Sequence, residues 1–310
     1  MISIKSVKSY IPEERIDVIA RANHLKVEEE FLKNKLGIQK LSLISKHEKA
    51  SDMAVNAVQS LLNESDLELQ DIECLVLCTQ NPDDLGLPHS SAIAHEKLAL
   101  SDDVACFDIS LGCSGYVYGL NVVQGMMLAN GYHNAVLVTA DPYSKIIDEN
   151  DKNTALLFGD AATATWLSEG NGWTIEKSLL HTRGSGGRYI KNIDGSLHMD
   201  GRQVFNFAMT VVPKQINEIL SLLNVEKASI DKWYLHQGSK FIVENLAKRL
   251  GLPMDKVPVE VHKCGNTVSS SIPLMIEGGI ENIMDKKIIL SGFGVGLSWG
   301  TMLLRNTTSI

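Results

Sequence analysis

The chain has 310 residues, enough for one large domain or two fused halves. Its composition, 44% hydrophobic and 21% charged, is that of a soluble globular protein, and a formal net charge of −8 argues against a nucleic-acid-binding surface. Five cysteines without regular spacing are typical of reduced thiols, and no apolar run approaches the ~18 residues of a membrane span. The N-terminus also lacks a signal-peptide core, so we expect a cytoplasmic protein with neither nucleic acid nor membrane as a partner.

The first half of the chain alternates helical and strand-like segments. Helices are expected where apolar residues recur every three or four positions, and strands where short apolar runs are bounded by turn residues. The sequence predicts, in chain order, a strand at 2–9, helices at 16–36 and 49–62, a strand at 72–79, a helix at 90–98, a strand at 104–109, a helix at 116–130, a strand at 135–140 and a strand after a break at Gly159 and Asp160. Gly37 and Gly131 are the expected ends of two of these helices.

The second half repeats this order of elements. The sequence predicts a helix at 204–223, a strand at 230–236, a helix at 241–250, a short strand at 257–261, a helix at 272–282, and strands at 287–291 and 297–304. The preserved order of buried strands and helices indicates an internal duplication. We therefore expect two α/β halves, residues 1–168 and 169–310, that form a layered α/β sandwich with helices on the faces of buried strands.

Residues 108–131 form the stretch around which the chain is organised. A strand-like run leads into DISLGCSGYVYGL, a turn rich in small residues, and a helix begins close to Cys113. A thiol at a helix start faces unpaired backbone N–H groups and the positive end of the helix dipole, which favour the thiolate. At such positions a cysteine pKa can fall from about 8.5 to roughly 3.5–7.5. From this stretch alone, a buried structural cysteine is an equally good interpretation.

Two polar residues of the second half occupy corresponding positions at a strand end and before a helix. His236 ends an apolar strand, and Asn266 precedes a helix. Alone, such a histidine is typical of a hydrogen-bonded core, and such an asparagine is typical of an N-cap. Together with Cys113 they make chemical sense, because a nucleophilic thiolate needs a nearby imidazole and two N–H donors could stabilise an oxyanion. The nine histidines show no metal-ligand spacing, so we expect no metal site.

These residues lie in motifs that resemble the thiolase superfamily, and most of all its β-ketoacyl-acyl-carrier-protein synthase III family. The resemblance rests on a nucleophile motif DISLGCSGYVYGL, a histidine motif LHQGSK, an asparagine motif KCGNTVSSSIP, and two further signatures, LFGDAATA and GFGVGLSWG. The motifs follow the family order over almost the whole chain. The resemblance implies a thiolase-like five-layer αβαβα sandwich, a homodimer, and a coenzyme A thioester as substrate with no permanently bound cofactor.

For the chemistry, the resemblance implies decarboxylative Claisen condensation. Cys113 would take an acyl group from acyl-coenzyme A, and His236 and Asn266 would bind the carbonyl of a malonyl thioester, on acyl carrier protein, while it loses carbon dioxide. The backbone N–H groups of Cys113 and Val295 would hold the oxyanion at the acyl carbon. Leu87 matches the position that reaches across the dimer into the partner's acyl pocket.

The substrate entrance departs from the family pattern. Phe31 stands in place of a tryptophan that stacks on the coenzyme adenine, and Lys35 and Lys152 replace two flanking arginines. A phenylalanine can still stack and a lysine can still meet phosphate, with less geometric precision. The family's histidine motif also continues to an arginine linked to carrier and coenzyme contacts, where this chain has Phe241 with Lys240 beside it.

Two other functions stay open. An acyltransferase of specialised metabolism would pass the acyl group from Cys113 to a hydroxyl or amine; the altered entrance favours this function, whereas the retained Asn266 favours condensation. The third hypothesis is a catalytically silent partner subunit, and the intact set of Cys113, His236 and Asn266 argues against it.

Overall fold

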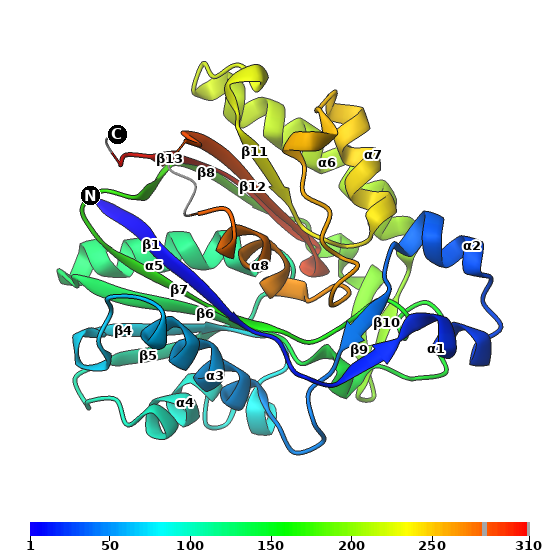
Figure 1. Cartoon of the computed structure of the whole chain (residues 1–310), viewed down its shortest axis with the longest axis horizontal. Coiled ribbons are helices and arrows are strands. Elements are labelled where there is room, and N and C mark those ends of the chain that lie inside the picture. Colours follow the sequence, from blue (N-terminus) through cyan, green and yellow to red (C-terminus); the bar gives the residue numbers. More distant parts are fainter. Residues whose placement is uncertain (281–283, 309–310) are drawn as a thin grey trace.

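A computed structural model gives the fold of the chain and describes residues 1–280 and 284–308. Within these residues a nine-stranded sheet runs in the order β11-β12-β13-β8-β1-β7-β6-β4-β5 (Figure 1). Its strands are β1 (Ile2–Tyr10), β4 (Cys74–Cys78), β5 (Ala105–Ile109), β6 (Asn134–Ala140), β7 (Ala162–Glu169), β8 (Trp173–Thr182), β11 (Lys232–Leu235), β12 (Lys287–Gly294) and β13 (Ser298–Asn306). Two small sheets pair β2 (Arg15–Asp17) with β3 (Lys40–Ser42) and β9 (Ile190–Ile193) with β10 (Ser196–Met199).

The large sheet has two parts that meet at a short joint. In the first part β4 pairs in parallel with β5 and β6, and β7 and β1 continue the sheet in antiparallel fashion. In the second part β11 and β12 are parallel, and β13 and β8 run antiparallel to their neighbours. The joint consists of two residue pairs between β1 and β8, in which Ser3 lies opposite Thr174 and Ile4 lies opposite Trp173. Each part uses strands from one end of the chain; the boundary between residues 168 and 169 stays a prediction.

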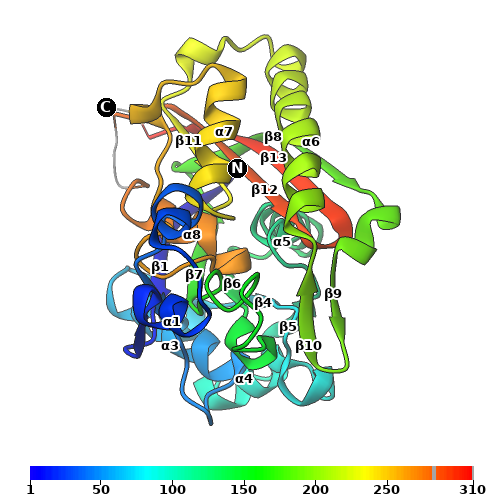
Figure 2. The same cartoon turned by 90° about the vertical axis from the view of Figure 1, so that its right-hand side faces the viewer.

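Helices cover both parts of the sheet and fill the space between them. The outer helices are α3 (Ala50–Asn63) and α4 (Ser90–Leu98) on the first part, and α6 (Gly201–Leu222) with α7 (Lys240–Leu250) on the second. Both α5 (Gly115–Asn130) and α8 (Ser271–Glu277) contact strands of the two parts, so they form the central layer (Figure 1 and Figure 2). The order of layers is helix, sheet, helix, sheet, helix, which confirms the predicted α/β sandwich.

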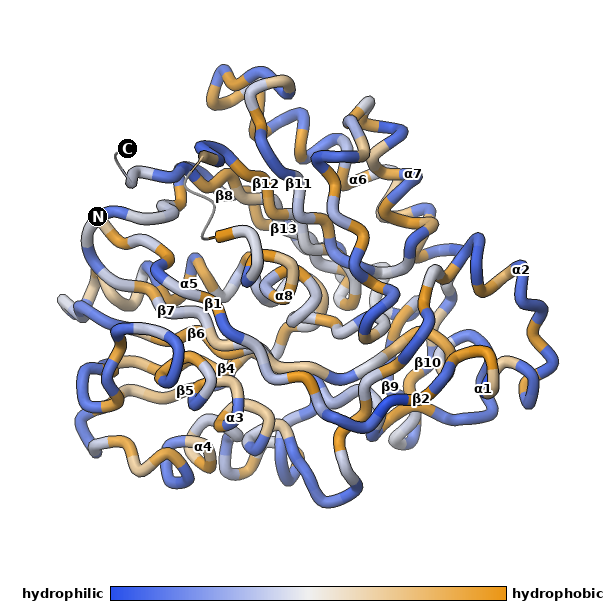
Figure 3. Tube along the Cα trace, viewed as in Figure 1, coloured by the Kyte–Doolittle hydropathy of each residue, from blue (hydrophilic) through white to orange (hydrophobic). Residues whose placement is uncertain are grey.

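The central helix α5 is buried because its sequence is mostly apolar. Leu120, Val123 and Met127 lie in the core between the two parts of the sheet. Gly119 permits a close approach, since a Cβ there would lie 2.8 Å from Leu137 Cδ1 on β6. A helix with little polar surface is stable where other elements cover its faces. Figure 3 shows the same separation of polar and apolar residues in the whole molecule, with hydrophilic residues in the outer loops and apolar residues along the inner strands.

The prediction of one helix at 16–36 is wrong. The chain instead forms α1 (Val18–His24), α2 (Glu29–Phe31) and a π-helical turn at Leu32–Leu36. The break comes at Lys26, whose φ of 56° is left-handed and cannot continue a right-handed helix. The end at Gly37 is as predicted, with φ 71°.

The prediction of a strand at 257–261 is also wrong. The backbone of this segment bonds to the Gln237 side chain: Glu260 N donates to Gln237 Oε1 at 2.9 Å, and Gln237 Nε2 donates to Pro258 O at 3.3 Å. Pro258 has no N–H to offer a neighbouring strand.

The other predicted helices and strands agree with observed elements to within a few residues, apart from the helix at 272–282. That helix starts near α8, which ends at Glu277, and the last two predicted positions lie outside the described residues. The sequence did not predict β8, β9 or β10. Among the described residues, no helix combines the length and apolar character that crossing a membrane requires.

Candidate active site

Cys113, His236 and Asn266 line one cavity of about 570 Å³. Cys113 lies just before α5, His236 directly follows β11, and Asn266 lies in the loop before α8. Three segments that are distant in the sequence therefore line the same cavity. Strand β12 links two of them, because its residue Ser291 bonds to His236 N and its Gly294 packs against Cys113.

Cys113 is held in a tight turn against β12. A Cβ on Gly294 would lie 2.6 Å from Cys113 Sγ, and a Cβ on Gly292 would lie 2.7 Å from the Cys113 carbonyl oxygen. Both glycines are therefore needed for β12 to pass this close to the cysteine. The first part of GFGVGLSWG is thus explained by packing against the nucleophile motif.

The Cys113 thiol is neutral at rest, contrary to the expectation from its helix-start position. Burial, aided by the negative charge of Asp141, raises the pKa of Cys113 to about 12. Hydrogen bonds from the backbone of Val295 and of Cys113 itself act in the opposite direction but do not offset burial. Asp141 is fully buried and accepts a hydrogen bond from Gln80 N at 2.7 Å. The two backbone groups expected at an oxyanion are those that contact the sulfur.

His236 is buried and oriented from two sides. Its Nδ1 lies 2.7 Å from Ser271 Oγ, and its ring meets Phe293 edge-on at 5.5 Å between centroids. The His236 N–H donates to Ser291 O at 2.9 Å, which ties the end of β11 to β12. Burial lowers the pKa of His236 to about 3, so the imidazole is neutral at pH 7. In the described part of the chain, Nε2 has no hydrogen-bond partner.

Asn266 is held through its backbone and its side-chain oxygen. Its N–H donates to Leu157 O at 2.8 Å, its carbonyl accepts from Gly159 N at 3.1 Å, and its Oδ1 accepts from Val268 N at 3.0 Å. The side-chain Nδ2 has no hydrogen-bond partner among the described residues, so both N–H bonds of this amide group are available to a substrate. Asp160, next to Gly159, accepts from Ile44 N at 3.0 Å. The LFGDAATA signature therefore clamps the loop that carries Asn266.

The entrance residues expected from the sequence lie in the same cavity. Phe31, Lys35 and Lys152 line it, and Phe31 is 45% exposed. Lys35 Nζ lies 3.5 Å from the centroid of the Phe241 ring, a cation–π contact, and Phe241 stacks on Phe205 with centroids 5.3 Å apart. The sequence singled out Phe241 only as a departure, and it gave no signal for Phe205, whose role depends on the stacked geometry.

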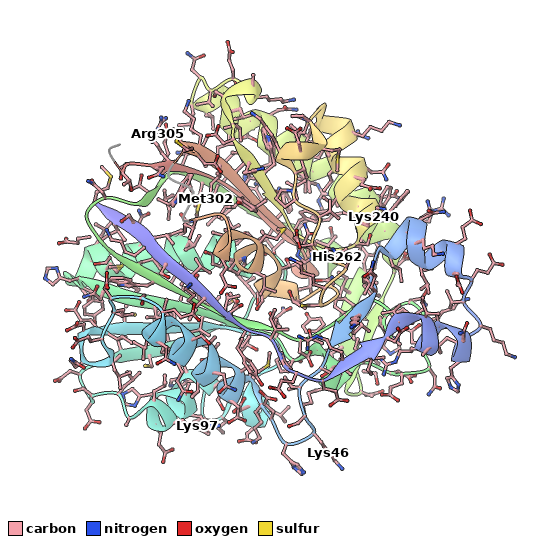
Figure 4. The ribbon with its side chains drawn as sticks, viewed as in Figure 1. Lys46, Lys97, Lys240, His262, Met302 and Arg305 are labelled. Carbon is pink, nitrogen blue, oxygen red and sulfur yellow. The ribbon has the colours of Figure 1, made fainter. Side chains whose placement is uncertain are left out.

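The side chains of three further predicted residues do not line this cavity. Lys240, labelled in Figure 4, lies at the start of α7. It lines a neighbouring groove with Lys33 and Lys40 and forms an ion pair with Glu244 at 3.8 Å. Val295 reaches the site through its backbone, not as a lining side chain. Leu87 is 85% exposed and lies outside the cavity of this chain. The cavity therefore unites six of the nine predicted site residues.

Comparisons with known proteins agree with this geometry. Residues 107–184 match a family model described as 3-oxoacyl-[acyl-carrier-protein] synthase III, and residues 220–306 match the model of its C-terminal part. The β-ketoacyl-[acyl-carrier-protein] synthase III of Neisseria gonorrhoeae (strain NCCP11945) is 30% identical over 319 residues, which cover 97% of this chain and 98% of that protein. The chain belongs to the β-ketoacyl-acyl-carrier-protein synthase III family. A relative of the same name from Staphylococcus aureus (strain Newman) is 32% identical over 310 residues, 98% of each chain.

The structure agrees with this membership. The crystal structure of 3-oxoacyl-[acyl-carrier-protein] synthase III from Aquifex aeolicus VF5 matches with a TM-score of 0.92 at 26% identity, and the match covers 98% of this chain and 100% of that one. The fold is therefore thiolase-like, and the protein is a β-ketoacyl-acyl-carrier-protein synthase III-like condensing enzyme.

Proposed function

We propose that this enzyme condenses an acyl group from acyl-coenzyme A with a malonyl thioester, carried by acyl carrier protein, through an acyl-Cys113 intermediate. The observation that carries the proposal is the cavity shared by Cys113, His236 and Asn266, with His236 Nε2 and Asn266 Nδ2 free of protein partners in the described residues. Coenzyme A enters as part of the substrate, and the proposal includes no permanently bound cofactor.

In the first half-reaction, the Cys113 sulfur attacks the carbonyl carbon of acyl-coenzyme A. A sulfur–carbon bond to Cys113 forms, the bond to the coenzyme sulfur breaks, and the thiol proton leaves with free coenzyme A. The oxygen of the tetrahedral intermediate would accept hydrogen bonds from the N–H groups of Cys113 and Val295, whose contacts with Sγ support this role. The N-terminal end of α5 adds a favourable field for that negative charge.

In the second half-reaction, the malonyl group loses carbon dioxide and keeps the bonding electron pair as an enolate. His236 and Asn266 would donate hydrogen bonds to the enolate oxygen, where charge develops. The lowered pKa of His236, about 3, supports a neutral donor. The carbanion then attacks the acyl carbon on Cys113, the carbon–sulfur bond breaks, and the released thiolate regains a proton. The product is a β-ketoacyl thioester.

The cavity entrance would bind the coenzyme. Phe31 would stack on a planar ring, while Lys35 and Lys152 would meet phosphates as point charges. We propose a separate role for Lys240, in the groove that Lys33 and Lys40 also line, as a contact for the anionic carrier thioester. A place in fatty-acid synthesis and a cytoplasmic location belong to the same proposal and rest on the family and on the five free cysteines.

The second candidate function is acyl transfer to a hydroxyl or amine of a metabolite. One observation favours it: Phe241 and Phe205 form an apolar stack in the cavity wall, at the position where the family's arginine contacts a carrier. Such a wall would accept a small acceptor without a carrier protein. In that reaction His236 would have to remove a proton from the acceptor instead of donating one.

We propose that the enzyme is a homodimer joined at β5. This strand ends the large sheet, pairs only with β4 among the described strands, and leaves Ala105, Cys106 and Phe107 partly exposed. An unpaired apolar edge strand is a surface for pairing with another chain. The exposed Leu87 would then reach the acyl site of the partner.

Two rates on each of three variants test the proposed condensation. Asn266→Ala should form acyl-Cys113 at nearly the wild-type rate, yet lose about 10²–10³ in carbon dioxide release from malonyl carrier, the usual cost of removing one oxyanion donor. Asn266→Asp is the matched control variant, because it keeps the oxygen that accepts from Val268 N but lacks the NH₂ donor; it should fail in the same way. His236→Ala should lose decarboxylation with a smaller loss in acylation. If Asn266→Ala turned over normally while His236→Ala transferred no acyl group, the proposed condensation would be contradicted and the acyltransferase function supported.

A further inference from the structure

We propose that Ser271 fixes the tautomer of His236, so that the imidazole presents an N–H, not a lone pair, to the cavity. Ser271 would then be a positioning residue: it acts on the substrate only through His236. Its importance for catalysis rests on the proposed condensation, whereas the tautomer itself is a property of the free enzyme.

The Ser271 hydroxyl has two close neighbours. Its Oγ lies 2.7 Å from His236 Nδ1, and Gln237 N lies 3.4 Å from the same oxygen. Ser271 is the first residue of α8 and is 3% exposed. The Gln237 backbone cannot turn away from Ser271, because the Gln237 side chain is itself fixed by Leu235 O at 2.8 Å and by Glu260 N at 2.9 Å.

A count of donors and acceptors selects one tautomer. Gln237 N–H can only donate, so Ser271 Oγ accepts from it. If His236 Nδ1 also carried a proton, Oγ would accept twice, and the buried hydroxyl hydrogen would have no protein acceptor among the described residues. If Nδ1 is unprotonated, the hydroxyl donates to it, and the Ser271 hydroxyl, the Gln237 N–H and Nδ1 are all paired. A neutral imidazole carries one proton, which then resides on Nε2.

The orientation of the ring makes this choice matter. Phe293 packs edge-on against the imidazole and Ser271 holds Nδ1, so Nε2 is the nitrogen left for the cavity that Cys113 and Asn266 also line. Nε2–H can donate to an enolate oxygen beside Asn266 Nδ2. It cannot accept a proton from a hydroxyl or amine without first changing tautomer. Ser271 therefore biases the site toward condensation and against the acyltransferase function.

One arrangement would defeat the inference. Ser271 also lines a second cavity, of about 440 Å³, which His236 does not line. If a water molecule there accepted a hydrogen bond from the Ser271 hydroxyl, His236 would be free to carry its proton on Nδ1. The two arrangements differ only in where the protons lie, so a spectroscopic measurement must separate them.

The decisive experiment combines nitrogen NMR with half-reaction kinetics on the full chain. Protein with ¹⁵N-labelled histidines gives ring-nitrogen signals that distinguish a protonated from an unprotonated Nδ1, and the difference spectrum with His236→Gln assigns His236 among the nine histidines. The wild type should show an Nε2–H tautomer. Ser271→Ala should shift His236 toward the other tautomer and lower carbon dioxide release by about 10–100-fold, the range known for partners that orient metal-bound histidines, with a much smaller loss in the coenzyme A burst. Ser271→Thr keeps the hydroxyl and should restore both.

Two results would overturn the inference: an Nδ1–H tautomer in the wild type, or a Ser271→Ala protein with an unchanged tautomer and an unchanged ratio of decarboxylation to burst. If Ser271→Ala fails to fold, the wild-type spectrum alone still decides the tautomer. A wild type that shows the Nε2–H tautomer but releases no carbon dioxide from malonyl carrier would support the tautomer inference and contradict the proposed condensation, so the two failures are distinguishable.

Discussion

Raising the pH should accelerate alkylation of Cys113 by iodoacetamide without a plateau near neutrality. The thiolate is the reactive form, and burial raises the pKa of Cys113 to about 12. At pH 7 only about one thiol in 10⁵ is then ionised, and this fraction grows about tenfold with each pH unit. The slope should continue from about pH 7 to about pH 9, because both ends lie well below the thiol pKa. Below pH 7 it should flatten, because burial raises the pKa of Asp141 to about 6 and protonation of this carboxylate removes the charge that disfavours the thiolate. His236, with its pKa lowered to about 3, should add no inflection in this range.

Asp141→Asn provides the matched perturbation. It removes the buried negative charge that disfavours the thiolate and keeps one side-chain oxygen for the hydrogen bond from Gln80 N, but its NH₂ group replaces the oxygen that accepts from the N–H and hydroxyl of Ser269. Loss of a nearby like charge should lower the Cys113 pKa by about one unit and raise the alkylation rate at fixed pH by about tenfold. The assay is intact-protein mass against time, with circular dichroism as a check of folding. A rate that levels off between pH 7 and pH 9, or a slower Asp141→Asn variant that remains folded, would refute this description of the thiol.

Two further predictions concern the entrance and the edge strand. Replacing Lys35 and Lys152 together by Glu should raise the KM for acyl-coenzyme A by about 3–10-fold and make the rate less sensitive to salt, whereas an unchanged KM and salt dependence would place the coenzyme elsewhere. Phe107→Lys on β5 should shift the protein toward monomers in sedimentation experiments, because a charge at an edge strand opposes pairing; an unchanged size would move the proposed interface away from β5.

Much of the fold could be predicted because local patterns agree with the final environment. Helix α3 has one apolar side, and β4 and β6 are continuous apolar runs that need cover on both faces. The errors occur where the local structure depends on a distant residue or on an unusual backbone conformation. The helix breaks at Lys26, which has a left-handed backbone although it is not a glycine, so the sequence gives no sign of the break. The loop at 257–261 is irregular because the Gln237 side chain bonds to its backbone.

The candidate site divides in a similar way. Cys113, His236 and Asn266 could be chosen from the sequence because each lies in a recognisable motif at the end of an element. The ionisation of Cys113 could not, since it depends on β12 and Asp141 enclosing the thiol, and neither neighbour is visible in the nucleophile motif. Ser271 lies inside the asparagine motif, yet only the 2.7 Å contact with His236 Nδ1 singles it out among neighbouring serines.

The most direct test of the proposed mechanism is the mass of the intact protein after incubation with a panel of acyl-coenzyme A compounds, followed by peptide mapping. We expect one acyl group per chain, on Cys113 alone, and its removal when malonyl carrier is added. Cys113→Ala should remain unlabelled, while Cys264→Ala, which alters another buried cysteine, should label as the wild type does. Label on Cys264, or equal label on several cysteines, would contradict the central claim that Cys113 carries the acyl group.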